Sequence, residues 1–157
     1  MIAAGQKIPS VTIKQATPEG GADCDPAQLF AGKKVVMFSL PGAFTPTCSS
    51  KHLPGYAQEL PALKAKGVDI VACLSVNDGF VMKAWAEQHD ALGKIVMLAD
   101  GAAAFSKALG IDFEIPGMGV RAKRALFTID NDVVKSVDVE APGKFEVSGV
   151  EACMLKI

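Results

Sequence analysis

Three short apolar runs, separated by stretches with helical character, set the strongest limit on how this chain can fold. The runs cover residues 33–39, 68–76 and 95–98, and the one over 68–76 is nearly continuous in apolar residues. Strands that are apolar on both faces are typical of parallel sheets buried between two layers of helices. Because parallel strands need a crossover between them, the intervening helical stretches favour a sheet with helices on both faces.

Capping residues and helix breakers predict where the helices lie. We expect helices over residues 26–30, 47–63, 79–90 and 102–109, and a last helix from residue 148 to the C-terminus. Asp25 is expected to cap the first of these helices, and Asn77-Asp78 the third. Proline removes a helical hydrogen bond, so Pro54 is expected to kink or divide the second helix. Phe80 and Trp85 are expected on the inner side of the third helix. Ser148 followed by Glu151 has the spacing of a capping box for the last helix.

The remaining segments complete a mixed sheet. Residues 11–14 alternate in polarity and predict a first short strand, whereas residues 111–122 contain glycines and a proline and predict a loop. Residues 123–129 and 133–139 predict two strands joined by an Asp-Asn-Asp turn. We therefore predict an α/β, thioredoxin-like fold with a mixed, mostly parallel sheet and helices on both faces. The whole chain, residues 1–157, is expected to form one domain.

Charge and targeting signals narrow the function classes. The chain has 16 lysines and arginines against 17 aspartates and glutamates, a net charge of −1. Such a chain has no strong field to hold nucleic acid or an anionic membrane, so we expect neither partner. The N-terminus lacks the pattern of a secretory signal peptide. Four cysteines without a CxxC pair are expected to be free thiols in a reducing compartment. That compartment is the cytoplasm, or an organelle matrix or stroma after removal of a targeting segment.

Cys48 is the thiol whose position favours chemistry. It follows the strand predicted over residues 33–39 and falls in the first turn of the next helix. Unpaired backbone amides and the helix dipole at such a position favour the thiolate, which is the nucleophilic form of cysteine. Open α/β sheets also place their active sites at the carboxyl ends of their strands. A small buried hydrophobic side chain is the alternative for an isolated cysteine.

The loop that leads to Cys48 carries a family pattern. Its sequence over residues 41–48, PGAFTPTC, closely resembles the peroxiredoxin signature Pro-x-x-x-Thr-x-x-Cys, with matches at Pro41, Thr45 and Cys48. The residues just after Cys48 and the segments SVNDGFVMKAW and GMGVRAKR, which end at Trp85 and Arg124, resemble the type II branch of that family. Three blocks in the same order make the resemblance specific, and it covers nearly the whole chain.

The resemblance implies a role for each matched residue. Cys48 would attack a peroxide oxygen and become a sulfenic acid. The Thr45 hydroxyl would bond to the thiolate and the peroxide, with a local turn or cap bond as the alternative, and Pro41 would shield the sulfur from water. Arg124 would supply a fixed positive charge for the thiolate and for the oxygen that gains negative charge. Arg121 is the competing candidate, and a solvated surface charge is the alternative for both arginines.

The other thiols and a nearby histidine receive weaker assignments. Cys73 could resolve the sulfenic acid, as in plant-like type II members, but its place in a central strand favours inert core. Cys153 matches the C-terminal resolving cysteine of some members poorly, and Cys24 is expected to be a surface thiol. His52 could support the thiolate or bind a metal, but a structural hydrogen bond is the preferred interpretation.

The function implied by the resemblance is a thiol peroxidase that reduces hydrogen peroxide and small alkyl hydroperoxides. It would need no metal, haem, flavin or other cofactor. Glutaredoxin with glutathione, or thioredoxin, would regenerate the thiol, and the chain would form a homodimer. A thioredoxin-type thiol-disulfide oxidoreductase is one rival, disfavoured by the missing CxxC pair. A redox sensor or holdase that uses the same reactive thiol is the other rival.

Overall fold

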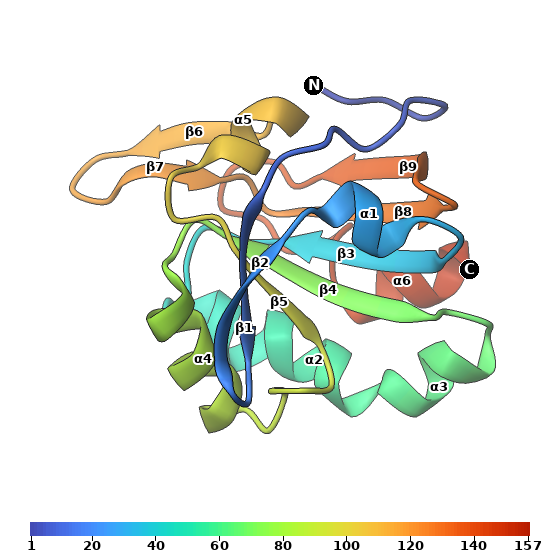
Figure 1. The fold of residues 1–157 in the computed structure, drawn as a ribbon, viewed down its shortest axis with the longest axis horizontal. Helices are drawn as coiled ribbons and strands as arrows, with labels where there is room; N and C mark the ends of the chain where they lie inside the picture. The colour runs from blue at the N-terminus through green and yellow to red at the C-terminus, as the bar shows by residue number, and fades with distance from the viewer.

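Seven of the nine strands form one mixed sheet in the computed structural model, which describes residues 1–157 (Figure 1). The strands are β1 (Ile13–Thr17), β2 (Gly20–Cys24), β3 (Lys34–Ser39), β4 (Ile70–Ser75), β5 (Val96–Ala99), β6 (Asp112–Ile115), β7 (Gly119–Ala122), β8 (Ala125–Asp130) and β9 (Val133–Val139). Their order across the sheet is β2-β1-β5-β4-β3-β8-β9, and β6 pairs only with β7. Strands β3, β4 and β5 are parallel, whereas the pairs outside them are antiparallel. The predicted mixed α/β sheet is confirmed, with parallel pairing at its centre.

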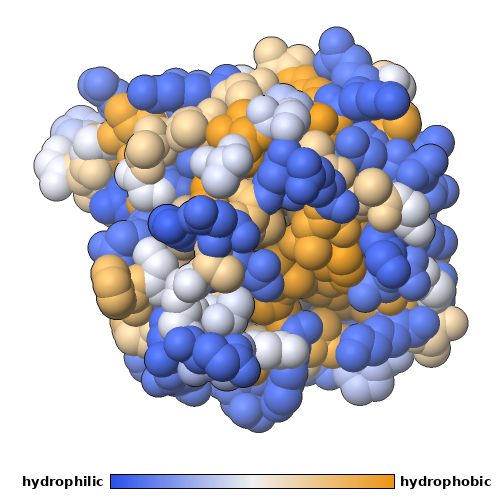
Figure 2. All heavy atoms as spheres, viewed as in Figure 1, coloured by the Kyte–Doolittle hydropathy of each residue, from blue (hydrophilic) through white to orange (hydrophobic).

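Helices cover both faces of this sheet, as predicted. They are α1 (Pro26–Phe30), α2 (Leu53–Gln58), α3 (Leu60–Ala65), α4 (Gly79–Gln88), α5 (Ala104–Leu109), α6 (Val150–Lys156) and a short π-helix, η1 (Cys48–His52). Helices α1 and α5 belong to the core layer that contains Met37 and Leu74, whereas α2, α4 and α6 belong to the layer that contains Phe38 and Cys73. Successive strand residues point to opposite faces, so each strand supplies both layers. On the face shown in Figure 2, hydrophobic side chains gather near the middle of the molecule and hydrophilic ones surround them.

Several local predictions are confirmed by the hydrogen bonds. Asp25 caps α1 by accepting from the amide of Ala27 at 3.0 Å, and Asp78 caps α4 by accepting from the amide of Val81 at 2.9 Å. The turn between β8 and β9 is also present. None of the helices has the length and apolar character that a membrane crossing requires.

The helix predicted from Thr47 to residue 63 is divided into three pieces. The amide of Leu53 donates to the carbonyl of Cys48, which makes the first piece a π-helix, and Pro54 lies in the first turn of α2. A second break falls at Glu59, before α3. The structure therefore confirms a division near Pro54 and adds one that was not predicted. Three short pieces have a weaker combined dipole at Cys48 than one continuous α-helix.

The prediction of a loop over residues 111–122 is wrong. The segment forms the antiparallel hairpin β6–β7, with Phe113 opposite Arg121. Gly117 and Gly119 have φ of 80° and 77°, so glycine allows the chain to reverse there at no steric cost. Residues that suggested a loop in the sequence are the turn of this hairpin.

Three smaller expectations also need correction. Phe80 is 90% exposed rather than on the inner side of α4, although Trp85 is fully buried as predicted. Gly149 rather than Ser148 precedes α6, because the Ser148 hydroxyl donates to Glu140 at 2.6 Å instead of capping the helix. The first strand covers β1 rather than residues 11–14, and it forms a hairpin with β2, which was not predicted.

Candidate active site

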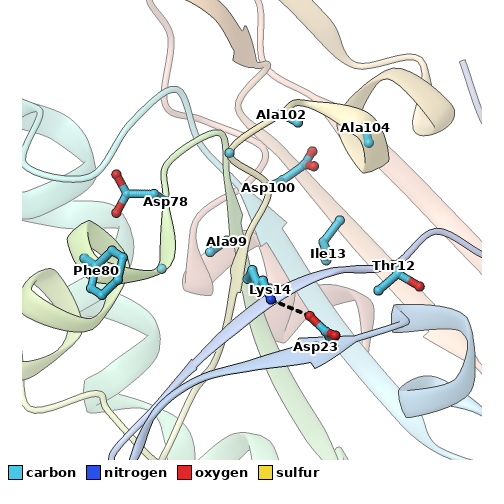
Figure 3. A pocket seen from close by; sticks show the side chains of 12 residues that line it. Thr12, Ile13, Lys14, Asp23, Asp78, Phe80, Ala99, Asp100, Ala102 and Ala104 are labelled. Atoms are coloured by element: carbon cyan, nitrogen blue, oxygen red, sulfur yellow. Dashed lines mark hydrogen bonds and ion pairs between the residues drawn. The ribbon is translucent and has the colours of Figure 1, made fainter.

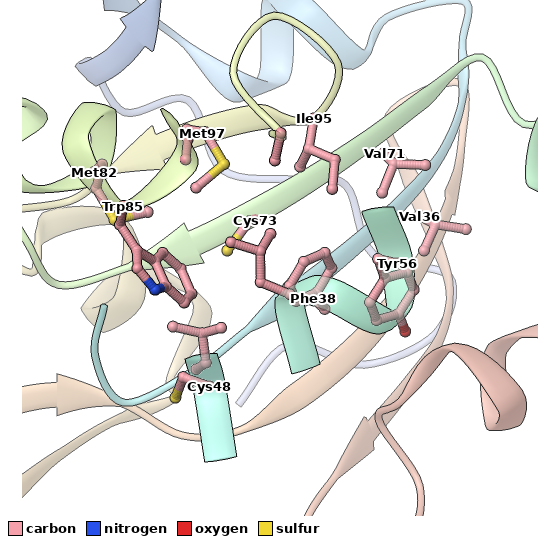
Figure 4. Close-up of a cluster of buried hydrophobic side chains, with 14 of the residues drawn as sticks. Val36, Phe38, Cys48, Tyr56, Val71, Cys73, Met82, Trp85, Ile95 and Met97 are labelled. Atoms are coloured by element: carbon pink, nitrogen blue, oxygen red, sulfur yellow. The ribbon is translucent and has the colours of Figure 1, made fainter. Parts of the chain in front are cut away.

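Cys48 lies where β3 has ended and the divided helix begins. It is the first residue of η1 and is fully buried. Figure 4 shows it near Trp85, at the margin of the hydrophobic cluster that also contains Cys73 and Phe38. The indole of Trp85 donates to the hydroxyl of Ser49 at 2.9 Å, which anchors the residue next to Cys48. The predicted position, after a central strand and at a helix start, is the one that the structure shows.

Arg124 is the side chain that contacts the Cys48 sulfur. Its Nη2 atom donates to Cys48 Sγ at 3.0 Å. The antiparallel register of β3 and β8 pairs Ser39 with Ala125, so the residue before β8 is carried to the end of β3, close to where Cys48 follows. A guanidinium keeps its positive charge at any physiological pH, so a permanent cation lies within hydrogen-bond distance of the sulfur.

His52 forms a hydrogen bond with Arg124 and none with Cys48. Its Nδ1 accepts from Arg124 Nη1 at 2.7 Å, so the proton lies on Nε2, which donates to the carbonyl of Ser148 at 3.1 Å. Burial, with the neighbouring Arg124 charge as the second cause, lowers the pKa of His52 to about 3. The imidazole is therefore neutral near pH 7 and serves as an acceptor that fixes the guanidinium. The predicted structural hydrogen bond of His52 is confirmed.

Glu140 is a part of the site that the sequence did not reveal. Its carboxylate accepts from the amides of Glu146, Val147 and Ser148 and from the Ser148 hydroxyl. Burial alone would raise the pKa of Glu140, but these hydrogen bonds outweigh it and lower the pKa. The carboxylate thus orders the loop whose Ser148 carbonyl receives His52. The only local signal was an acidic residue directly after a valine-rich strand.

The same loop places an aromatic ring over the two basic side chains. Phe145 lies edge-on to the His52 ring at 5.1 Å, and the Arg124 guanidinium carbon is 5.9 Å from its centroid. A cation at that distance from a ring centroid is attracted by the ring quadrupole. Residues far apart in the sequence therefore combine to orient the cation at Cys48.

Thr45 and Pro41 lie in the loop before Cys48, but the predicted bond from Thr45 to the sulfur is not present. The Thr45 hydroxyl donates to the carbonyl of Gly42 at 2.7 Å, the local turn bond that was the alternative. Its oxygen therefore keeps lone pairs that can accept a hydrogen bond from an incoming molecule. Pro41 forms part of the wall of a cavity beside Arg124.

Arg121 occupies a different position from Arg124. Its Nη1 donates to the carbonyl of Val76 at 3.1 Å and to that of Pro41 at 3.5 Å, and its Nε donates to Met118 at 3.2 Å. These bonds tie the β6–β7 hairpin to the loop before Cys48. The geometry distinguishes the two candidate arginines: Arg124 touches the sulfur, and Arg121 holds the surrounding backbone.

The other three thiols are buried and free. Burial raises the pKa of Cys73 well above its usual value and the pKa of Cys153 to about 11. Cys24 is only 8% exposed, at the end of β2, so the expectation of a surface thiol is wrong. Burial, with Asp25 as the second cause, raises the pKa of this thiol too. Among the four, only Cys48 accepts a hydrogen bond from a guanidinium.

Two cavities of the molecule each have a volume that can hold a small organic molecule. One, of about 470 Å³, adjoins Arg124, Pro41 and Thr47. The other, of about 360 Å³, lies between the β1–β2 hairpin and the start of α4 (Figure 3). In the second cavity Asp23 is paired with Lys14, and the remaining carboxylates cap α4 and bind amides at the start of α5. No group of three or more metal-binding side chains gathers in either place. The first cavity is lined by Arg124, whose guanidinium contacts the Cys48 sulfur, whereas the second lies away from that contact.

Comparison with known proteins agrees with this geometry. Residues 3–154 match the family model described as Redoxin. Peroxiredoxin-2E-2, chloroplastic, of rice is 44% identical to this chain, and the aligned region covers 99% of this chain and 72% of the rice protein. Peroxiredoxin-2E, chloroplastic, of Arabidopsis thaliana is 39% identical, and the aligned region covers 96% of this chain and 67% of the Arabidopsis protein. The crystal structure of reduced Prx3 in complex with H2O2 from Vibrio vulnificus superposes with a TM-score of 0.95, at 52% identity over 99% of both chains. The chain therefore belongs to the redoxin family as a type II peroxiredoxin, a thiol-dependent peroxidase.

Proposed function

We propose that Cys48 is the peroxidatic residue and that it reduces hydrogen peroxide and small alkyl hydroperoxides. The observation that carries this proposal is the 3.0 Å contact between Arg124 Nη2 and Cys48 Sγ. The thiolate sulfur attacks one peroxide oxygen, the O–O bond breaks, and the other oxygen leaves as hydroxide or alkoxide and takes up a proton. Sulfur is oxidised to the sulfenic acid, and the peroxide is reduced to water or an alcohol.

The residues around the sulfur have distinct roles in this step. Arg124 places its positive charge where the thiolate and the departing oxygen share negative charge. Thr45 accepts a hydrogen bond from the peroxide, because its own proton is directed to Gly42. Pro41 covers the approach to the sulfur and keeps bulk water away from it. The binding of H2O2 by the similar Vibrio vulnificus protein supports peroxide as the ligand of such a site.

A thioredoxin-type reductant returns the sulfenic acid to the thiol. We propose glutaredoxin with glutathione, or thioredoxin, as that reductant. A first thiol attacks the sulfenic sulfur and releases water, and a second thiol then reduces the mixed disulfide. Cys48 is fully buried, so η1 must unwind before an external thiol can reach the sulfur.

A homodimer is supported by exposed apolar side chains near the Cys48 loop. Phe44 is 51% exposed and has φ of 64°, a conformation that is unfavourable for a bulky residue. The amide of Ala43 in this loop donates to Asn77, three residues before the exposed Phe80, and a Cβ added at Gly42 would lie 3.8 Å from Met118. Three exposed apolar groups on adjoining segments favour a protein contact surface. We propose that two copies of the chain meet there.

We further propose that the chain forms a single domain and acts in a reducing compartment. The continuous seven-stranded sheet supports one domain over residues 1–157. A peroxidase that relies on cellular thiols acts in a reducing compartment, either the cytoplasm or an organelle matrix or stroma. The chloroplastic names of two relatives support the organelle alternative, and the distribution of a fluorescent fusion would distinguish the two.

Replacing Cys48 by serine tests the central proposal. Serine is nearly the same size as cysteine but cannot be oxidised to a sulfenic acid, so Cys48→Ser should consume no peroxide while retaining the fold. Cys24→Ser, a change of the same kind in the opposite core layer, is the matched control and should keep wild-type activity. Peroxide loss is measured with a dye, and sulfenic acid is trapped and located by mass spectrometry. Peroxidase activity that survives in Cys48→Ser would disprove the assignment.

A further inference from the structure

The cavity beside Arg124 is larger and more apolar than hydrogen peroxide needs. Its volume of about 470 Å³ is within the range of sites that hold organic ligands, whereas a water molecule takes up about 30 Å³ of liquid. Apolar side chains of β6, β9 and the following loop form much of its wall: Phe113, Ile115, Val139, Pro142 and Phe145. This composition suits a hydrocarbon group attached to the peroxide.

The cavity also carries positive charge that the chemistry at Cys48 does not use. Its charged lining consists of Lys123, Arg124 and Lys144 against the single carboxylate of Glu140. Arg124 is bonded to Cys48 and His52, and Glu140 is bonded to the loop amides and Ser148. Lys123 and Lys144 are exposed and form none of the four ion pairs of the molecule. Two unpaired ammonium groups therefore remain at the edge of an apolar cavity.

We propose that this cavity selects organic hydroperoxides that carry a carboxylate. The peroxide group lies at Arg124, whose guanidinium contacts Cys48, the hydrocarbon part packs on the apolar wall, and the carboxylate binds Lys123 and Lys144. The proposal rests on the proposed role of Cys48 and uses the same chemical step, so the product is the corresponding hydroxy acid. Lys123 and Lys144 determine specificity and touch no reacting atom.

The apolar wall of the cavity favours an organic hydroperoxide as its ligand over a polar thiol reductant. A carboxylate-bearing thiol such as glutathione could satisfy the two lysines, but its polar peptide groups would be desolvated against the apolar side chains. A hydrocarbon chain between peroxide and carboxylate fits both the wall and the charges. The experiment must therefore measure oxidation of Cys48 and its reduction separately.

Cumene hydroperoxide and its ring-carboxylated analogue provide a matched substrate pair. The rate constant for oxidation of the reduced enzyme is measured with each, and the ratio of the two is the readout. Wild-type protein should prefer the carboxylated substrate by about tenfold, and the preference should shrink as salt is added, since exposed charges are screened. Lys123→Gln and Lys144→Gln should each lower the ratio by about threefold, and the double variant should bring it close to one. Lys135→Gln, which removes an exposed lysine of β9 outside this cavity, is the control and should keep the wild-type ratio.

The possible outcomes separate the two proposals. If the wild-type enzyme reacts with hydrogen peroxide but the ratio is the same in the double variant, the carboxylate subsite does not exist. If the variants instead slow only the reduction of the oxidised enzyme by glutathione, the cavity serves the reductant and the proposal is overturned. If hydrogen peroxide does not oxidise Cys48 in the wild type, the proposed function itself fails.

Discussion

Two buried thiols, Cys48 and Cys73, belong to the same hydrophobic cluster but sit on different kinds of backbone. Cys73 lies in β4 and is paired with Phe38 of β3 on one side and Met97 of β5 on the other. Cys48 starts a short π-helix that is followed by two further helix pieces. Both side chains are fully buried, so solvent exposure does not distinguish them.

Two physical differences separate these thiols. A cation lies against Cys48, whereas burial raises the pKa of Cys73 well above its usual value. The first turn of a helix can also open at low cost because its amides have no helical partners, whereas a central strand cannot leave without breaking two ladders. We therefore propose that the reactivity of Cys48 depends both on its contact with the Arg124 cation and on the ease with which its helical turn can open.

The largest expected effect tests the charge contact. Arg124→Gln should lower the rate constant of Cys48 with peroxide by about 10²–10³-fold, a loss of about 2.7–4 kcal/mol, if Arg124 acts as one oxyanion donor. Arg121→Gln is the matched variant and should lose less, because Arg121 binds backbone carbonyls instead of the sulfur. Stopped-flow oxidation of the reduced protein measures both. A larger loss in Arg121→Gln would show that the contact with the sulfur is not the decisive difference.

The second prediction concerns how the free energy of unfolding depends on pH through His52, which orients Arg124 beside Cys48. The pKa of His52 is lowered to about 3 in the fold, below the value of about 6.5 in an unfolded chain. Between these two pH values the unfolded chain binds a proton that the folded chain does not, so stability is complete above pH 6.5 and falls as the pH is lowered. The slope from this group approaches about 1.4 kcal/mol per pH unit below pH 6.5.

Urea unfolding followed by circular dichroism at pH 7, 6 and 5 measures that slope. His52→Gln should flatten it, and His89→Gln controls for loss of the only other histidine. Glu140, whose pKa is lowered, adds its own loss only below about pH 4.5. An unchanged slope in His52→Gln would mean that His52 binds its proton equally well in the folded and the unfolded chain, so that folding does not lower its pKa.

A smaller effect is expected from Thr45. Thr45→Val keeps the side-chain shape and removes the oxygen that can accept from peroxide, so the oxidation rate should fall by up to about tenfold, or about 0.5–1.5 kcal/mol for one hydrogen bond. Thr45→Ser retains the hydroxyl and should stay close to the wild type. Equal rates for Thr45→Val and the wild type would remove Thr45 from the peroxide site.

The smallest effect is expected at Cys73, and it tests the mobility part of the comparison. Cys73→Ser should keep substantial turnover with peroxide, glutaredoxin and glutathione, because an external thiol can resolve the sulfenic acid once η1 has unwound. A disulfide between Cys48 and Cys73 would need α-carbons within about 7 Å and is not formed in this structure. Collapse of steady-state turnover with a normal first oxidation would make Cys73 an obligatory resolving residue.

The sequence predicted the parts of the fold that depend on local pattern. Continuous apolar runs predicted β3, β4 and β5, and Asp25 and Asp78 were recognised as caps because the bond they make is to a nearby amide. The family motif identified Arg124, which the pairing of β3 with β8 then brings to Cys48.

Long-range hydrogen bonds explain what was missed. Ser148 has the spacing of a cap, but a buried carboxylate at Glu140 competes for its hydroxyl. The bond from His52 to the Ser148 carbonyl likewise joins segments 96 positions apart, and no local pattern encodes it. The β6–β7 hairpin was missed because its glycines and proline have the composition of a loop.

The hydrogen bond from Trp85 to Ser49 gives the protein an intrinsic optical signal. Trp85 is the only tryptophan of the chain, so its fluorescence comes from one buried indole. The unwinding of η1 that we propose would remove the Ser49 acceptor and admit water to the ring, and the emission intensity and wavelength should change with it. The rate of conversion between the folded and opened forms of the Cys48 turn could thus be measured from the fluorescence of Trp85, without an attached dye.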